Sequence, residues 1–412
     1  MKKFSILPLV GCLALQFAAF GQAADWLQFR GTDNTGSTGA AKVPATEFVV
    51  KTEGSERKNV LWSVELPFAG VSSPIVVGDR LYVTGVTGAR QERLHVVCYA
   101  KSDGKQLWQR QFWATGRTLC HPTSSVAANT PASDGSRVYA FFSSNDLVCL
   151  DLDGNLEWFR GLTFEHPAAA NDVGMAASPL VVSGAVVVQV ENKGDSFAAG
   201  IDAVTGETLW QHPRKADMNW TSPTLFHPPG GKPLVLLQST HQITAHDPRS
   251  GEEVWSYDGK LAEISSPVSR GDLVILPADG LTAIRAGAGS ANWEKLWQES
   301  GLSTGSPSAV LHGDRVYVLN RAGVLTAGDI ATGKVLWKAR VKGPYWATPV
   351  AVGEYLYLVN QDGAAHVIKT SVEKGEIVSE TEFGEQMLAS PAYSDGALYF
   401  RGAKHLWKIG SP

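Results

Sequence analysis

The chain has 412 residues, of which 44% are hydrophobic and 18% charged, and a net charge of −4 at pH 7. Its 42 glycines, 21 prolines and 13 tryptophans, together with little helical periodicity, indicate an all-β protein with many turns. The small net charge and the lack of a Lys/Arg cluster argue against nucleic acid and against an anionic membrane surface as partners.

The N-terminus predicts a cleaved signal peptide over residues 1–24. Lys2 and Lys3 precede the apolar run Phe4–Phe20, and small residues follow up to Ala24. We therefore expect a periplasmic or secreted protein. The alternative is a membrane-anchored lipoprotein, because Leu9-Val10-Gly11-Cys12 resembles a lipobox that would place a lipid on Cys12. No later stretch is long and apolar enough to span a bilayer.

Residues 25–58 form an aromatic lead-in with a Gly/Thr/Ser-rich run, and a repeated pattern occupies residues 59–412. The clearest copy is Leu325–Trp337, LTAGDIATGKVLW, in which an apolar run is followed by a polar turn with glycine and a run ending on tryptophan. Glycine tolerates positive φ in such turns, so each copy predicts a two-stranded antiparallel hairpin.

A dipeptide of a hydroxyl residue and proline precedes each hairpin. There are eight: Ser73-Pro74, Thr130-Pro131, Ser178-Pro179, Ser222-Pro223, Ser266-Pro267, Ser306-Pro307, Thr348-Pro349 and Ser390-Pro391. Proline can open a strand without losing a ladder hydrogen bond. Repeats of about 40–50 residues with four strands each are typical of a β-propeller. The sequence therefore predicts an eight-bladed all-β propeller.

The strand around Trp62 has no hairpin partner before it, and the last repeat, after Ser390-Pro391, has only three strands. We expect the N-terminal strand to complete the last blade, which joins the two ends of the chain and removes open sheet edges.

Seven tryptophans are predicted to wedge between blades and to cover the turn of the next blade: Trp62, Trp108, Trp158, Trp210, Trp255, Trp297 and Trp337. In the remaining repeat Val378 and Phe383 replace them. Three cysteines, Cys98, Cys120 and Cys149, remain in the mature chain. Cys98 and Cys149 stand where other repeats have alanine, so we expect small buried residues there and not a disulfide.

The hairpin repeat resembles the pyrroloquinoline-quinone (PQQ) enzyme repeat, whose docking motif reads Ala-x-Asp-x-x-Thr-Gly-x-x-x-Trp. The segments Ile201–Trp210 and Asp329–Trp337 fit it. The resemblance implies one of two branches. One is the quinoprotein alcohol dehydrogenases, oxidoreductases with PQQ and calcium. The other is the non-enzymatic propellers typified by the outer-membrane assembly factor BamB.

The dehydrogenases hold their quinone against a disulfide between adjacent cysteines, and this sequence has no Cys-Cys pair. It also has no GxSxG, HExxH or P-loop motif. We therefore expect a monomeric, non-catalytic scaffold without cofactor or metal that binds an envelope protein, a peptide or a small ligand. The PQQ-dependent oxidoreductase is the alternative.

Residues just before each hydroxyl-proline dipeptide should line one mouth of the central channel. The candidate ligand-binding residues there are His121, Asn129, Glu165, Asp172, Asn219, Trp220, Glu263, Tyr345 and Trp346. The three aromatic residues of this set bind a ligand or plug the channel, and the sequence leaves both options open. Aromatic and acidic residues near the mouth also suggest a third alternative, a carbohydrate-binding or cleaving propeller.

The two longest inter-blade segments, Phe112–Asn129 and Leu162–Ala177, are the richest in polar residues. Loops longer than a repeat needs are often functional.

Overall fold

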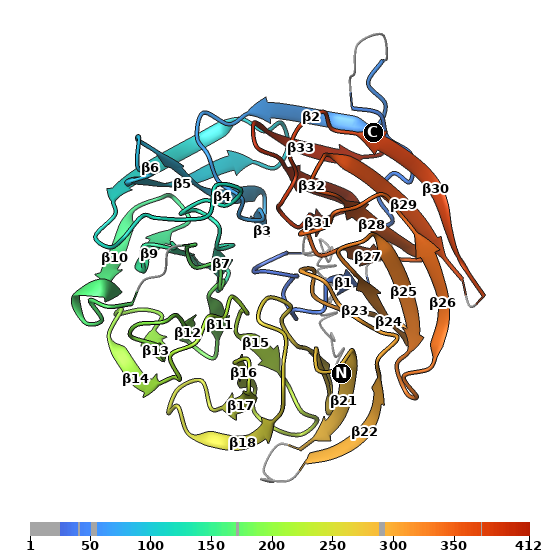
Figure 1. The fold of residues 1–412 in the computed structure, drawn as a ribbon. Helices are drawn as coiled ribbons and strands as arrows, with labels where there is room; N and C mark the ends of the chain where they lie inside the picture. Colours follow the sequence, from blue (N-terminus) through green and yellow to red (C-terminus); the bar gives the residue numbers. More distant parts are fainter. Residues whose placement is uncertain (1–24, 40–41, 51–55, 170–172, 288–292, 372) are drawn as a thin grey trace, which may run out of the picture.

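The computed structural model describes residues 25–39, 42–50, 56–169, 173–287, 293–371 and 373–412. The predicted signal peptide, Cys12 and Asp172 lie outside these ranges. Eight antiparallel blades of four strands each stand around a central axis as a propeller, and β1 (Ser37–Thr38) adds a short parallel strand to β27 (Val350–Val352) of the seventh blade (Figure 1). The predicted fold is confirmed. The described ranges contain no α-helix and one 3₁₀ turn, η1 (Leu162–Phe164), and no helix among them is long and apolar enough to cross a membrane.

Each blade runs from an inner strand near the axis to an outer strand at the rim. The first four blades are β3 (Ile75–Val77), β4 (Arg80–Thr87), β5 (Arg93–Ala100) and β6 (Gln106–Trp113); β7 (Ala132–Ser133), β8 (Arg137–Phe141), β9 (Asp146–Asp151) and β10 (Leu156–Gly161); β11 (Leu180–Val182), β12 (Ala185–Val190), β13 (Phe197–Asp202) and β14 (Thr208–Pro213); and β15 (Thr224–Phe226), β16 (Leu234–Gln238), β17 (Gln242–His246) and β18 (Glu253–Asp258).

The other four blades follow in the same order. They are β19 (Val268–Arg270), β20 (Leu273–Leu276), β21 (Leu281–Ala286) and β22 (Trp293–Glu299); β23 (Val310–His312), β24 (Arg315–Leu319), β25 (Val324–Asp329) and β26 (Val335–Arg340); β27 (Val350–Val352), β28 (Tyr355–Val359), β29 (Ala364–Thr370) and β30 (Gly375–Glu382); and β31 (Ala392–Ser394), β32 (Ala397–Arg401), β33 (His405–Gly410) and β2 (Val60–Glu65).

The eighth blade is built from both ends of the chain. Its outer strand β2 pairs antiparallel with β33, with Val60 opposite Ile409 and Glu65 opposite His405. The predicted closure by the strand around Trp62 is therefore confirmed. Because the ends of the chain share one sheet, the ring cannot open without breaking this ladder.

Outer-strand tryptophans dock on the third-to-fourth-strand turn of the following blade. The indole of Trp108 donates its Nε1 hydrogen to the Leu152 carbonyl at 2.9 Å. A Cβ added at Gly154, whose φ is +84°, would lie 2.7 Å from the same ring. The glycine is thus required by its conformation and by the close approach of the indole. Five further indoles donate to the next blade in the same way: Trp62 to Lys101, Trp158 to Ala203, Trp210 to Pro248, Trp297 to Ile330 and Trp337 to Ser371.

Small residues on the third strand leave room for these rings. Cys98 lies opposite Trp108 and Ala327 lies opposite Trp337. Cys149 occupies the same register, and all three cysteines of the described chain are free thiols. Burial raises the pKa of Cys98 and that of Cys149 to about 12, so both act as small apolar residues.

The seventh blade lacks this docking contact. The strand register places Ser379, and not the expected Val378, at the tryptophan position opposite Val367. The following blade explains the difference, because its strands β33 and β2 come from opposite chain ends and no turn joins them. A tryptophan on β30 would have no turn to cover. Phe383 packs instead on Trp407 and on Phe48 of the lead-in, with ring centroids 4.7 Å and 6.0 Å apart.

A belt of hydroxyl groups links the inner strands. In the first seven blades, a backbone N–H at or beside the dipeptide donates to a hydroxyl of the next blade, as Ser178 does to Ser222 at 2.9 Å. Seven such bonds run in succession through Ser73, Thr130, Ser178, Ser222, Ser266, Ser308, Thr348 and Ser390. In the sixth blade the belt residue is Ser308 and not Ser306, the hydroxyl of the expected dipeptide.

The lead-in fills the axis of the ring, where its blue trace and β1 (Ser37–Thr38) lie in Figure 1. It contacts the inner part of every blade, in chain order except that Asn34 contacts the fourth blade and Arg30 reaches the fifth. The bonds are Trp26 with Val76, Ser133 to Leu27, Val181 to Gln28, Leu225 to Asn34, Arg30 to Pro267, Leu311 to Thr35, Ala351 to Gly36 and Tyr393 to Lys42. The segment Asp25–Lys42, apart from its two undescribed residues, therefore acts as the plug of the channel.

We expect Trp297→Ala to lower the free energy of unfolding by about 3 kcal/mol, because it removes a buried indole and leaves the Ile330 carbonyl without its donor. Trp113→Ala is the matched control, since Trp113 is 59% exposed, and should cost less than about 0.5 kcal/mol. Urea-induced unfolding of both variants measures the difference. Equal losses would contradict the docking role.

We expect Ser222→Ala to destabilise the protein by about 1–3 kcal/mol, because the buried N–H of Ser178 loses its acceptor. Ser306→Ala is the control, because the Ser306 hydroxyl is buried and has no hydrogen-bond partner within the described ranges. Its removal should change the stability little. Thermal unfolding compares the two, and a similar loss in both would show that the belt contributes nothing.

Candidate functional site

Three of the candidate residues are buried and hold the fold. The Asn129 amide donates to the Ala177 carbonyl at 2.6 Å, and the Asn219 amide donates to the Gln238 carbonyl at 2.7 Å. The Tyr345 hydroxyl lies 3.1 Å from Nδ1 of His366 and is fully buried. These side chains tie the connecting loops to neighbouring loops and strands.

Trp220 and Trp346 are half-buried and bonded to neighbouring loops. The Trp220 indole donates to the Gly174 carbonyl at 2.9 Å, across to the loop that enters the third blade. The Trp346 indole donates to Oε1 of Gln361 at 2.7 Å, and the guanidinium of Arg321 lies over its ring. Each indole is thus bonded to a loop beside its own.

The remaining described candidates, His121, Glu165 and Glu263, are exposed. Nδ1 of His121 bonds to the hydroxyl of Thr123 at 2.8 Å, and Glu165 forms an ion pair with Arg160. The two glutamates stand on connecting loops two blades apart, and no described contact joins them. Asp172, the third acidic candidate, lies outside the described residues.

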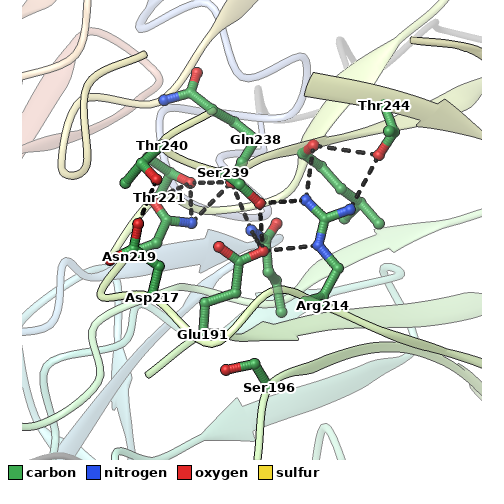
Figure 2. Close-up of polar contacts among 12 residues, drawn as sticks. Glu191, Ser196, Arg214, Asp217, Asn219, Thr221, Gln238, Ser239, Thr240 and Thr244 are labelled. Carbon is green, nitrogen blue, oxygen red and sulfur yellow. Dashed lines mark hydrogen bonds and ion pairs between the residues drawn. The ribbon is translucent and has the colours of Figure 1, made fainter. Parts of the chain in front are cut away.

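A buried polar network that the sequence did not indicate lies beside Asn219 (Figure 2). Its centre is an ion pair between Glu191 and Arg214, with Nε and Oε1 at 2.7 Å and with side chains 1% and 5% exposed. The same Oε1 accepts hydrogen bonds from Ser239 at 2.7 Å and from Gln189 at 3.0 Å. Because a single guanidinium neutralises a single carboxylate, the network is a charge-balanced brace between the third and fourth blades.

No local signal marks this network. Glu191 and Arg214 lie 23 residues apart, at opposite sides of one hairpin. An acidic residue at the end of a strand reads as a solvated surface residue until its burial is known. The second strands of the fourth and eighth blades also end in polar residues, Gln238 and Arg401, so Gln189 does not stand out in the sequence.

The two longest connecting segments meet at the rim of the second blade. They form the interblade groove, a cavity of about 450 Å³ lined by Thr115, Gly116, Arg117, Thr163, Phe164, Pro167 and Ala168. Thr115 donates through its backbone and its hydroxyl to the buried carboxylate of Asp146, which fixes one wall. The 3₁₀ turn η1 directs Phe164 outward on the other wall.

Large apolar side chains are exposed around the groove. Phe164 is 80% exposed, and Trp113 and Leu119, in the segment that forms the first wall, are 59% and 48% exposed. Of the nine exposed large hydrophobic residues in the described chain, three lie in the two segments that form the groove, namely Trp113, Leu119 and Phe164, whereas Leu107 and Leu156 lie near the far ends of β6 and β10. Such a concentration on one sector of a ring is a feature of interaction surfaces.

The sequence matches the family model of the outer membrane protein assembly factor BamB over residues 53–200, 96–280 and 195–346. These overlapping matches cover more than half of the chain. The chain belongs to the BamB-like family of propellers. The BamB of Burkholderia pseudomallei is 23% identical over 395 residues, which are 91% of this chain and 93% of that relative.

Quinoprotein relatives are also similar. A polyvinylalcohol dehydrogenase of a Sphingopyxis species is 24% identical over 254 residues, which cover 56% of this chain but only 34% of that enzyme. Among solved structures, the BamB of Moraxella catarrhalis aligns with a TM-score of 0.60 at 18% identity, over 85% of this chain and 96% of that one. The quinohemoprotein alcohol dehydrogenase of Comamonas testosteroni aligns with a TM-score of 0.71 at 13% identity, over 94% and 80%. These structural likenesses show the shared fold.

A calcium-bound quinone does not fit the described residues. Within the described ranges no group of three or more His, Cys, Asp or Glu side chains is arranged to hold a metal ion. Glu191, the buried carboxylate of the network, is already neutralised by Arg214.

We expect Glu191→Gln to destabilise the protein by about 3–5 kcal/mol, because the buried guanidinium of Arg214 loses its counter-charge. Glu165→Gln is the control, since the exposed pair with Arg160 should contribute less than about 1 kcal/mol. Urea-induced unfolding at pH 7 separates them. A small loss in Glu191→Gln would show that the network is not a brace, and would reopen it as a ligand site.

Proposed function

We propose that this protein is a non-catalytic scaffold of the cell envelope that binds an extended segment of a partner protein in the interblade groove. The observation that carries the proposal is the exposed aromatic side chain of Phe164 on a groove of about 450 Å³ formed by the two longest connecting segments. When a partner covers an exposed aromatic side chain, its burial contributes strongly to the free energy of binding.

The shape of the site favours a peptide over a small molecule. The groove is open along the rim, and its walls come from loops whose bases are fixed by Asp146 and by the outer strands. Trp113 and Leu119 extend the apolar surface on one side. An extended segment with apolar side chains at alternate positions would cover both parts of this surface.

The comparisons support the envelope part of the proposal. The relative that spans nearly the whole chain is named for outer membrane protein assembly, and the N-terminal residues have the pattern of a signal peptide. The scaffold as proposed requires no cofactor. This part of the proposal is supported by the poor fit of the described residues to a calcium-bound quinone. We propose that the similarity to the dehydrogenases reflects the shared propeller fold.

We expect Phe164→Asp to abolish retention of the partner in a pulldown from envelope extract. Val204→Asp is the matched control, because Val204 is also exposed, at 58%, but lies on a turn of the third blade. A band retained by the natural chain and by Val204→Asp, and lost with Phe164→Asp, is the expected result. Bands that both variants retain would contradict the site. A rise in Tm upon addition of PQQ and calcium would contradict the function.

A further inference from the structure

Two histidines flank the docked indole at the joint between the third and fourth blades. Trp210 donates to the Pro248 carbonyl in the turn of the fourth blade. The rings of His212 and His246 lie beside this indole, with centroids 5.1 Å and 6.1 Å from that of Trp210. The two imidazoles are 5.3 Å apart. His246 is 4% exposed, so the pair belongs to the packing between the two blades.

Both histidines bind the same carbonyl of that turn. Nε2 of His212 lies 2.8 Å, and Nδ1 of His246 lies 3.0 Å, from the oxygen of Gly251. A carbonyl oxygen only accepts hydrogen bonds, so each of these two nitrogens carries a hydrogen. The other ring nitrogen of His246, Nε2, lies 2.9 Å from the hydroxyl of Thr244. In the neutral imidazole this nitrogen is an acceptor, and Thr244 donates to it.

Other blades have different side chains at these two places. Two residues after the docking tryptophan, where the third blade has His212, the first blade has Arg110, which donates to the turn carbonyl of Gly154. Arg160 is placed in the same way in the second blade. At the register of His246, four other blades have an aliphatic residue: Leu150, Ile201, Ile284 and Ile368. Two titratable rings thus stand where the joint of the first and second blades has a permanent cation and an aliphatic side chain.

The histidine pair is connected to the ion pair of the buried network. Nη1 of Arg214 donates to the hydroxyl of Thr244 at 3.2 Å, and Nε of Arg214 binds Glu191 (Figure 2). The backbone of Glu191 forms a β-bridge with Asn219, in the loop that enters the fourth blade. One polar chain therefore runs from His246 at the docking turn to this loop.

The surroundings of His246 disfavour a second proton on its ring. Burial has the largest effect and lowers the pKa of His246 to about 4, although its bond to the Gly251 carbonyl opposes the shift. His212 and Arg214, which approach from the third blade, lower this pKa further. The neutral ring is thus the form that fits the closed joint.

The acidic side chains near the joint do not compensate for a charge on His246. Glu191 is already neutralised by its arginine partner. Asp247 accepts hydrogen bonds from backbone N–H groups of its own turn, and Lys232, in the connection from β15 to β16, adds a positive charge near it. Glu253 lies opposite His246 in the ladder but is exposed to solvent. Acid therefore adds a charge that these carboxylates do not balance.

We propose that this joint is a pH-sensitive switch, which is closed at neutral pH and opens in mild acid when His246 takes up its second proton. In the protonated ring Nε2 is a donor, so Thr244 must turn its hydrogen toward the Leu237 carbonyl, 3.4 Å away. The imidazolium and the guanidinium of Arg214 then face the same hydroxyl. Their repulsion loosens the docking turn and, through the polar chain, the loop that carries Asn219.

The direction of the pKa shift fixes the pH window of the switch. When the joint is open, His246 is solvated and takes up its proton near the ordinary pKa of 6.5, whereas in the closed joint it does so only near about 4. The contribution of His246 to closure is therefore fully present above pH 6.5 and is lost as the pH falls toward 4. Within this window the equilibrium constant for opening rises about tenfold per pH unit.

Hydrogen exchange of the full chain, measured by mass spectrometry at about pH 7.5 and at about pH 5 and corrected for intrinsic exchange rates, tests the switch. We expect the opening constant of peptides from β14 and β17 to rise about 30-fold at the lower pH. Peptides from β6 and β9 are the internal control, because their joint has Arg110 and Leu150 in place of the histidines. Equal changes at both joints, or no change at either, would overturn the proposal.

His246→Ile separates the switch from other effects of acid, because isoleucine does not titrate and stands at this register in three other blades. This variant should lose the acid-induced exchange of β14 and β17. His227→Gln is the matched control, since His227 is exposed in the connection from β15 to β16, and should respond as the natural chain does. An unchanged response in His246→Ile would contradict the switch. The comparison of the two joints in the natural chain stays decisive if this variant does not fold.

Discussion

The ring depends on one repeated contact, the docking of an outer-strand indole on the glycine turn of the following blade. The indole needs a turn without a Cβ beneath it and a small residue beside it, so glycine, tryptophan and a small third-strand residue recur together in the repeats that make this contact. The contact is directional, since each blade covers its successor. Ser379 on the seventh blade shows the limit of this rule, because the eighth blade is closed by two chain ends and offers no turn.

This construction determines where a partner can bind. The lead-in lies along the axis, where its Trp26 and Arg30 contact the inner strands, so it takes up space that a ligand there would need. The aromatic residues at the mouth are bonded to neighbouring loops, as Trp220 is to Gly174. The two longest connecting segments form a groove at the rim, and one of them carries the exposed Phe164.

The fold could be predicted from the sequence because its determinants are local and periodic. The hairpin turns and the eight hydroxyl-proline dipeptides mark the blades one by one. The unpaired strand at Trp62 predicts that the N-terminal strand completes the last blade. The positions of single residues were predicted less accurately. The structure has Ser308 in the place expected for Ser306, and Ser379 in the place expected for Val378. The candidate site was less predictable. Glu191 contacts Arg214, and the lead-in contacts every inner strand. These contacts join residues that are distant in the sequence, so they produce no recognisable spacing pattern.

The most direct test of the account is site-specific photo-crosslinking in intact cells, with a photoreactive phenylalanine analogue at position 164 and, in parallel, at positions 346 and 204. The account predicts one discrete protein adduct from position 164 and none from the other two. Adducts only from position 346, or none from position 164 when the chain is fully expressed and folded, would contradict the central claim that this propeller holds its partner at the rim between its first two blades.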